Sequence, residues 1–138
     1  MRWVVPKIRV LVANRPRLMR ELVVATISDQ PDIEIVGVLE EESAILKTVE
    51  DLHPDFLIIT LDRSETRPLI CDILLTRFPQ VCILALAPDR DSTMFYWATQ
   101  NIRSSRVENS EEGILGILRD RKLHVLESDK TSPHLRAN

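Results

Sequence analysis

The chain has 138 residues, of which 44% are hydrophobic and 28% are charged, and its formal net charge is −3. This size and composition predict a single folded domain around one core. The charge balance argues against a nucleic-acid-binding protein, and no apolar run approaches the roughly 20 residues that a membrane-spanning helix needs.

The cysteines and histidines indicate neither a disulfide nor a metal centre. Cys71 and Cys82 fall in a predicted helix and a predicted strand, and we expect both to be buried and reduced, as in a cytoplasmic protein. The three histidines are scattered and have no metal-ligand spacing. Residues 1–6 are too short and too quickly followed by charge to be a signal peptide, so we expect a cytoplasmic location.

Strand-like and helix-like patterns alternate along the first half of the chain. In order, they predict a strand over 8–13, a helix over 18–28, a strand over 33–38, a helix over 43–52 and a strand over 55–61. Leu18, Leu22 and Ala25 share one face of the first helix, and we expect this face to be buried. Ser43 is the expected N-cap of the second helix.

The alternation continues through the second half. The patterns predict a helix over 67–77, a strand over 81–87, a helix over 91–100, a weak strand at about 102–107 and a helix over 110–123. We therefore place one domain at residues 7–123 and expect the polar segment 124–138 to be a flexible tail. Five strand–helix units in a row predict a three-layer α/β/α fold, with helices on both faces of a parallel sheet.

Three segments carry a resemblance to a known family. Residues 53–61, HPDFLIITL, resemble the central strand of response-regulator receiver domains, whose usual pattern is RPDVVLLDL. Residues 8–22 and 30–39 resemble the receivers that usually precede a LuxR-type helix-turn-helix domain. The resemblance implies a CheY-like, flavodoxin-like (βα)5 fold, doubly wound, with strand order 2-1-3-4-5.

Every position that carries the chemistry of a receiver differs in this chain. The two Mg²⁺-binding acids fall on Asn14 and Arg15, the phosphoacceptor aspartate on Thr60, the hydroxyl residue after strand four on Ala87, and the switch lysine on Arg106 or Asn109. Mg²⁺ requires anionic oxygen ligands, which an amide and a guanidinium do not supply. The resemblance therefore implies a degenerate pseudo-receiver that binds no Mg²⁺, is not phosphorylated, contains no catalytic residue and is not an enzyme.

Two further features have more than one interpretation. Asn14, Arg15 and Thr60 could together form a pocket for an anion. Arg15 could instead pair with Asp62 or Glu40, or extend into solvent. The run from Met94 to Trp97 lies in the predicted fourth helix. Its large side chains either cover the sheet or form an interface. The candidate interface residues are Met94, Phe95, Tyr96, Trp97 and Arg103.

The leading functional hypothesis is a stand-alone atypical receiver domain in a bacterial two-component (phosphorelay) type signalling system. It would act by phosphorylation-independent contact with a protein partner or a second copy, through the face formed by helix four, strand five and helix five. The alternative is a sensor of a small molecule or anion that uses the altered pocket. Neither hypothesis involves a cofactor, a nucleic acid or a membrane.

Overall fold

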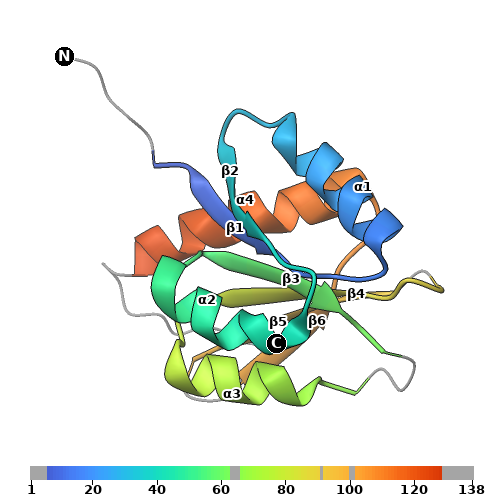
Figure 1. Ribbon diagram of the computed structural model, residues 1–138. Helices are drawn as coiled ribbons and strands as arrows, with labels where there is room; N and C mark the ends of the chain where they lie inside the picture. The colour runs from blue at the N-terminus through green and yellow to red at the C-terminus, as the bar shows by residue number, and fades with distance from the viewer. Residues whose placement is uncertain (1–5, 63–65, 91, 100–101, 129–138) are drawn as a thin grey trace.

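The computed structural model describes residues 6–62, 66–90, 92–99 and 102–128, the last eight of them by backbone alone. Its strands are β1 (Ile8–Val12), β2 (Ile33–Val38), β3 (Phe56–Thr60), β4 (Cys82–Leu86), β5 (Thr93–Ala98) and β6 (Ile102–Arg106). Its helices are α1 (Arg17–Ser28), the short 3₁₀ helix η1 (Glu42–Ala44), α2 (Ile45–Leu52), α3 (Leu69–Arg77) and α4 (Glu111–Ser128). Figure 1 shows the strands in one sheet and the helices packed around it.

The sheet has six strands in the order β2-β1-β3-β4-β5-β6. The first four are parallel, whereas β5 runs antiparallel to β4 and β6 runs antiparallel to β5. The predicted order 2-1-3-4 is therefore confirmed, and the sheet differs from the predicted one beyond β4. Because β6 is parallel to β4, its carboxyl end lies at the same edge of the sheet as the ends of β1, β3 and β4.

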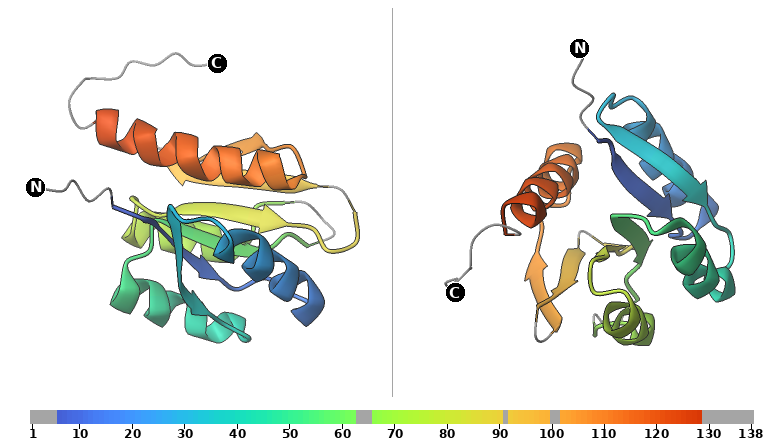
Figure 2. Two further views of the ribbon diagram at one scale, coloured as in Figure 1. Left: turned by 90° about the horizontal axis from the view of Figure 1, so that it is seen from above. Right: turned by 90° about the vertical axis from the view of Figure 1, so that its left-hand side faces the viewer.

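Helices cover both faces of the sheet, which confirms the three-layer α/β/α architecture. Ile45 and Val49 of α2 pack with Leu74 of α3 in one core cluster. Ile27 of α1 packs with Leu118 of α4 in the other. Figure 2 shows α4 on one side of the sheet and α2 and α3 on the other. Both core cysteines are free and buried, as expected.

The central strands explain why the fold was predictable up to β4. All five residues of β4 are buried, and so are the first four of β3. A strand that is covered on both faces has continuous apolar sequence rather than alternation. These runs are the patterns that predicted the parallel part of the sheet.

The predicted helix over 91–100 is wrong, because residues 93–98 form strand β5. The sequence of this strand, TMFYWA, contains three consecutive aromatic residues after a β-branched one, a composition that favours strands. Tyr96 packs into the cluster beneath α3, while Phe95 and Trp97 contact the cluster beneath α4. Alternate burial on both faces of a sheet accommodates these side chains better than the single buried stripe of a helix.

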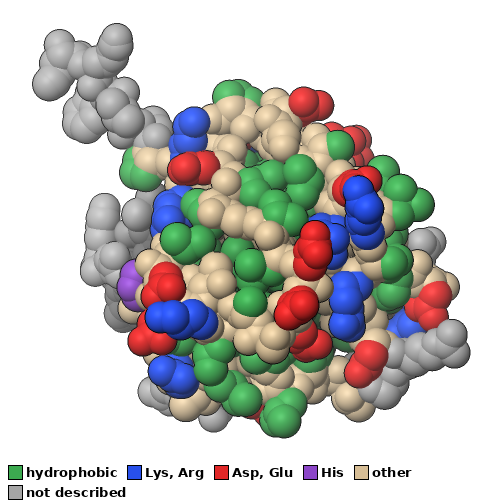
Figure 3. Space-filling view, in the orientation of Figure 1, with side chains coloured by type: hydrophobic (Ala, Val, Ile, Leu, Met, Phe, Trp, Pro, Cys, Tyr) green, Lys and Arg blue, Asp and Glu red, His purple; other side chains and the backbone are tan. Residues whose placement is uncertain are grey.

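The expected buried face of α1 is also wrong. Leu18 is 68% exposed and Leu22 is 56% exposed, whereas Arg20 and Ile27 are buried. The sheet-facing side follows the spacing i, i+3, i+4, i+7, which corresponds to Arg20, Val23, Val24 and Ile27. An arginine at the first of these positions hid the pattern. Hydrophobic side chains consequently reach the surface among charged ones (Figure 3).

Two helix boundaries differ from those predicted. The turn η1 precedes α2, which begins at Ile45, so Ser43 is not its N-cap and no side-chain cap forms there. The last helix, α4, continues to Ser128, past the predicted end at residue 123, and residues 129–138 lie outside the described part of the chain. No helix in the described ranges is long and apolar enough to cross a membrane.

Candidate functional site at the carboxyl edge of the sheet

The sequence-predicted site positions lie along the carboxyl edge of the sheet. Asn14 and Arg15 follow β1, Thr60 is the last residue of β3, and Ala87 follows β4. Thr60 pairs in register with Leu86, so it lies beside the end of β4. This edge is where open α/β sheets bind ligands, and the geometry at each position decides what chemistry is available there.

Thr60 ties the end of β3 to the loop after β1. Its Oγ1 accepts a hydrogen bond from the backbone N–H of Arg15 at 2.7 Å, and its hydroxyl lies 3.4 Å from the Arg15 carbonyl oxygen, to which it donates. The hydroxyl therefore has both a backbone donor and a backbone acceptor as partners. A short polar side chain at a strand end commonly bonds to backbone in this way, and here the contact is structural.

Arg15 directs its guanidinium into solvent. Its side chain is 53% exposed, and Nη1 lies 3.9 Å from Oε1 of Glu42, a separation and exposure that make the ion pair weak. Of the alternatives, extension into solvent describes Arg15 best, and its weak ion pair is with Glu42 rather than with Asp62 or Glu40. Arg15, Glu42 and Thr60 line a shallow depression of about 10 Å³, room for about one water molecule.

Asn14 lies on the other face of the sheet from this depression. Ala13 packs with the cluster beneath α2, whereas Val12 packs with the cluster beneath α1. Because side chains alternate along extended backbone, Asn14 faces α1. It is fully buried, and neither Oδ1 nor Nδ2 has a hydrogen-bond partner. Asn14, Arg15 and Thr60 therefore do not converge on one cavity.

Ala87 lies beside Thr60, whereas Arg106 and Asn109 lie beyond the rearranged strands. Ala87 is buried, and its N–H donates to the Ser92 carbonyl at 3.0 Å. Arg106 ends β6 and donates from Nη1 to Oγ of Ser92 at 3.2 Å. Since β4 and β5 lie between β3 and β6, Arg106 is about 14 Å from Thr60 across the sheet. Asn109, the other candidate for the switch-lysine position, accepts a hydrogen bond from the Thr93 hydroxyl at 2.9 Å.

The residues at this edge do not fit a magnesium ion. Mg²⁺ takes hard, anionic oxygen ligands in octahedral geometry. Asn14 offers one buried neutral amide, and Arg15 offers a cation. No step that depends on the metal can be built on this pair of side chains.

The aromatic residues expected at an interface belong mainly to the core. Phe95 and Tyr96 are 2% exposed, and Met94 and Trp97 are partly buried. The ring of Phe95 stacks on that of Trp97 with centroids 5.0 Å apart, and burial raises the pKa of the Tyr96 hydroxyl. The four residues lie on a strand, so the expected face with a fourth helix does not exist here. Arg103 is exposed on β6.

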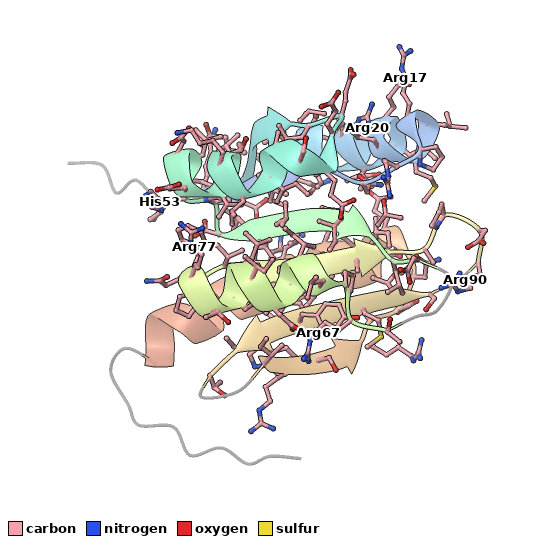
Figure 4. All side chains as sticks on the ribbon, turned by 60° about the horizontal axis from the view of Figure 1, so that its bottom comes forward. Arg17, Arg20, His53, Arg67, Arg77 and Arg90 are labelled. Atoms are coloured by element: carbon pink, nitrogen blue, oxygen red, sulfur yellow. The ribbon has the colours of Figure 1, made fainter. Side chains whose placement is uncertain are left out.

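A buried arginine at this edge was not anticipated. Arg20 of α1 is 8% exposed, and its Nη1 donates to the carbonyl oxygen of Asn14 at 3.4 Å. Arg17, three residues earlier on the same helix, instead points away from the body of the molecule (Figure 4). The spacing of Arg20 with Val23, Val24 and Ile27 is the one sequence signal that could have identified it.

The comparison with solved structures shows the fold. No protein-family model matches the chain. A 60-residue stretch, 44% of the chain, is 38% identical to a protein-glutamate methylesterase/protein-glutamine glutaminase from a Nocardioides species; the match spans 16% of that protein. The signal receiver domain of the putative response regulator NarL from Mycobacterium tuberculosis aligns with a TM-score of 0.53 and 20% identity, over 62% of this chain and 69% of that one. The chain therefore has the fold of a response-regulator receiver domain, with an altered strand order beyond β4.

Proposed function

We propose that the chain is an atypical receiver domain in a bacterial two-component type signalling system, and that it acts in the cytoplasm by binding a protein partner without being phosphorylated. The observation that carries this proposal is the state of Thr60. Its hydroxyl is bonded to the backbone of Arg15 at the position where the resembling family has its phosphoacceptor carboxylate. A threonine cannot form an acyl phosphate.

Among the described residues, the Thr60 hydroxyl has no hydrogen bond to a carboxylate or imidazole that could act as a general base. A hydroxyl needs a general base within hydrogen-bond reach to become nucleophilic. The side chains closest to this position include the Arg15 guanidinium and the Glu42 carboxylate, and these pair weakly with each other. The proposal therefore has no group-transfer step and no bound Mg²⁺.

The separation of the edge positions supports a conformation that does not depend on phosphorylation. A switch requires a side chain that responds to a charge at Thr60. Ala87 has no polar side-chain atom, and Arg106 is two strands farther along the sheet than β4. Control would then come from the amount of the protein or from its partner, which is either another protein or a second copy.

The similarity to a methylesterase does not extend this proposal to catalysis. The match spans 16% of that enzyme, and the described part of the present chain brings no nucleophile and base together at the carboxyl edge. We propose a binding role alone. The alternative of a ligand pocket at Arg15 and Thr60 is not favoured, because the depression there holds about one water molecule.

Intact mass spectrometry after incubation with acetyl phosphate and Mg²⁺ tests the proposal. We expect no phosphoryl adduct on the natural chain. The matched control is the triple variant Asn14→Asp, Arg15→Asp, Thr60→Asp, which restores carboxylates at the three positions and shows whether this backbone can support the reaction. An adduct on the natural chain would contradict the proposal whatever the triple variant does.

A further inference from the structure

We propose that a small oxyanion of the phosphate class binds on the α1 side of the carboxyl edge, between the guanidinium of Arg20, the side-chain amide of Asn14 and the first turn of α1. This site lies on the opposite face of the sheet from the depression at Arg15 and Thr60. It is independent of the proposed signalling function, because it requires no phosphotransfer and no partner.

The first observation is a buried positive charge without a counter-charge. Arg20 is 8% exposed, and the contact that the structure gives its guanidinium is one long hydrogen bond, 3.4 Å, to the carbonyl oxygen of Asn14. Across the described residues, no carboxylate lies within 4 Å of the Arg20 guanidinium. Buried charges in proteins are normally paired, because desolvation of an unpaired ion is costly. A bound anion would supply the missing charge.

The second observation is an unsatisfied amide beside that guanidinium. Asn14 is fully buried, and its Nδ2 and Oδ1 both lack a partner. Buried polar groups without partners are rare, and each one points to a water, an ion or a ligand. The residue whose backbone carbonyl accepts the hydrogen bond from Arg20 is the one with the unsatisfied side-chain amide. The positive charge of Arg20 disfavours a cation here, and the Nδ2 group can donate to an anion.

The third observation is the start of α1. The N-cap is Pro16, no side chain caps the helix, and its first turn contains no acidic residue. The first N–H groups of a helix lack intrahelical acceptors and lie at the positive end of the helix dipole, where anions bind favourably. Arg17 adds positive charge to this turn, although its side chain is engaged with Glu21 at 2.8 Å. The helix start thus adds donors to the same place.

The chemistry selects an oxyanion over a halide. A guanidinium presents paired N–H donors in a planar fork that matches two oxygens of a phosphate or carboxylate. The amide of Asn14 adds a donor from a different direction, which suits a tetrahedral group better than a single point charge.

The direct test is an NMR titration of the full chain with millimolar inorganic phosphate, against sodium chloride of equal ionic strength. We expect saturable shifts of the Asn14 side-chain amide and the Arg20 Nε–H, with a smaller response to chloride. No shift at these two groups, an equal response to chloride, or shifts confined to exposed arginines would overturn the proposal. The first of these results would mean that ordered water satisfies Asn14.

Variants provide a second test that does not depend on resonance assignment. Asn14→Asp places a carboxylate beside Arg20, so we expect a higher melting temperature than the natural chain in chloride and at least a tenfold loss of phosphate affinity. Arg20→Met should also lose the saturable phosphate response. Arg15→Gln, which changes an exposed guanidinium on the other face, should keep it. Phosphate also stabilises proteins by exclusion from their surface, but that effect does not saturate, and Arg20→Met would share it. A saturable response retained by Arg20→Met, or lost in Arg15→Gln, would contradict the assignment.

Discussion

At the residue scale, the side chain at the end of β3 connects two backbone segments, the strand end and the loop after β1. The Thr60 hydroxyl bridges to Arg15 across 45 positions of sequence. The sequence predicted that Thr60 lies near the end of a strand, and the structure confirms this. It did not predict the partner of the hydroxyl, because that depends on how the loop after β1 passes the end of β3.

Replacing Thr60 tests this structural role. Thr60→Val keeps the shape of the side chain and removes both hydrogen bonds, so we expect a loss of about 1 kcal/mol in the free energy of unfolding. Thr60→Ser keeps the hydroxyl and should lose less. Urea unfolding followed by circular dichroism measures both. Equal stability of the natural chain and Thr60→Val would show that the bridge contributes nothing.

His53 is held in an unusual backbone conformation. It follows α2 with φ 49° and ψ 60°, the left-handed region that favours glycine at helix ends. The contact made by this residue uses its backbone, because its carbonyl accepts a hydrogen bond from Arg9 Nη1 at 2.7 Å. We therefore expect His53→Gly to raise the midpoint of urea unfolding by the equivalent of about 0.5–1 kcal/mol. His53→Ala is the control and should give no gain; a destabilised glycine variant would count against this account.

At the element scale, the two glycines of α4 have opposite surroundings. A Cβ at Gly113 would collide with the backbone oxygen of Glu108, whereas a Cβ at Gly116 meets nothing within 4 Å. The sequence placed both glycines in one predicted helix and gave no means of distinguishing them, because the difference comes from the turn that leads into α4. Helix propensity alone treats them alike.

Matched alanine substitutions separate these two environments. Gly116→Ala should stabilise the protein by about 0.5–1 kcal/mol, because alanine is the better helix former. Gly113→Ala should destabilise it by about 1–3 kcal/mol, because the backbone around Glu108 must move. Thermal unfolding of the two variants compares them directly. A similar effect of both substitutions would mean that the start of α4 differs from the structure described.

Strand β5 was predicted as a helix because of the pattern of the elements before it. Residues 91–100 follow three strand–helix units and a fourth strand, and the expectation of a fourth helix outweighed the local composition. The aromatic run was itself the contrary signal, since aromatic residues favour strands. Tertiary context favoured the strand over the helix, because the edge of β4 was available for pairing. Phe95 pairs with Leu84 and Tyr96 pairs with Ile83.

At the scale of the whole molecule, the parallel half of the sheet could be predicted and the other half could not. Strands β3 and β4 have continuous apolar sequences that indicate burial on both faces. The order of β1 to β4 follows from the receiver resemblance. Beyond β4, the hairpin of β5 and β6 replaces a helix–strand unit. The candidate site was divided in the same way: residues near β1 and β3 were placed at the correct edge, while Arg106 was moved away by the inserted strand.

A long-range ion pair links α4 to the residue before β2 and makes the stability of the protein depend on pH. Arg119 of α4 donates to both carboxylate oxygens of Asp32, at 2.7 and 2.9 Å, and to Oε1 of Gln30 at 2.8 Å. The hydrogen bond from Arg119 lowers the pKa of Asp32 below its ordinary value of 3.8. Because the pKa of Asp32 is lower in the folded than in the unfolded state, its ionised form stabilises the protein at pH values above the unfolded-state pKa. This contribution is lost as the pH falls through the folded-state pKa.

Asp32→Asn should therefore lower the free energy of unfolding at pH 7 and lower it less at acidic pH, because protonation of the natural carboxylate weakens the same ion pair. The expected loss at pH 7 is about 1 kcal/mol or less, because both side chains are roughly half exposed. Glu21→Gln, which removes an exposed ion pair within α1, is the control and should leave the free energy of unfolding nearly unchanged at both pH values. Urea unfolding at the two pH values measures the difference. An unchanged cost at low pH would contradict the assigned pairing.

The central claim is that the carboxyl edge does not respond to a phosphoryl group. The most direct measurement is the ¹H–¹⁵N NMR spectrum of the chain titrated with beryllofluoride, a phosphoryl mimic, in the presence of Mg²⁺. We predict no saturable shift at Thr60, at Leu61 or along β5. Saturable shifts centred on Thr60 that spread to β5 and β6 would show a working phosphoryl site coupled to the rearranged sheet, and would contradict the account.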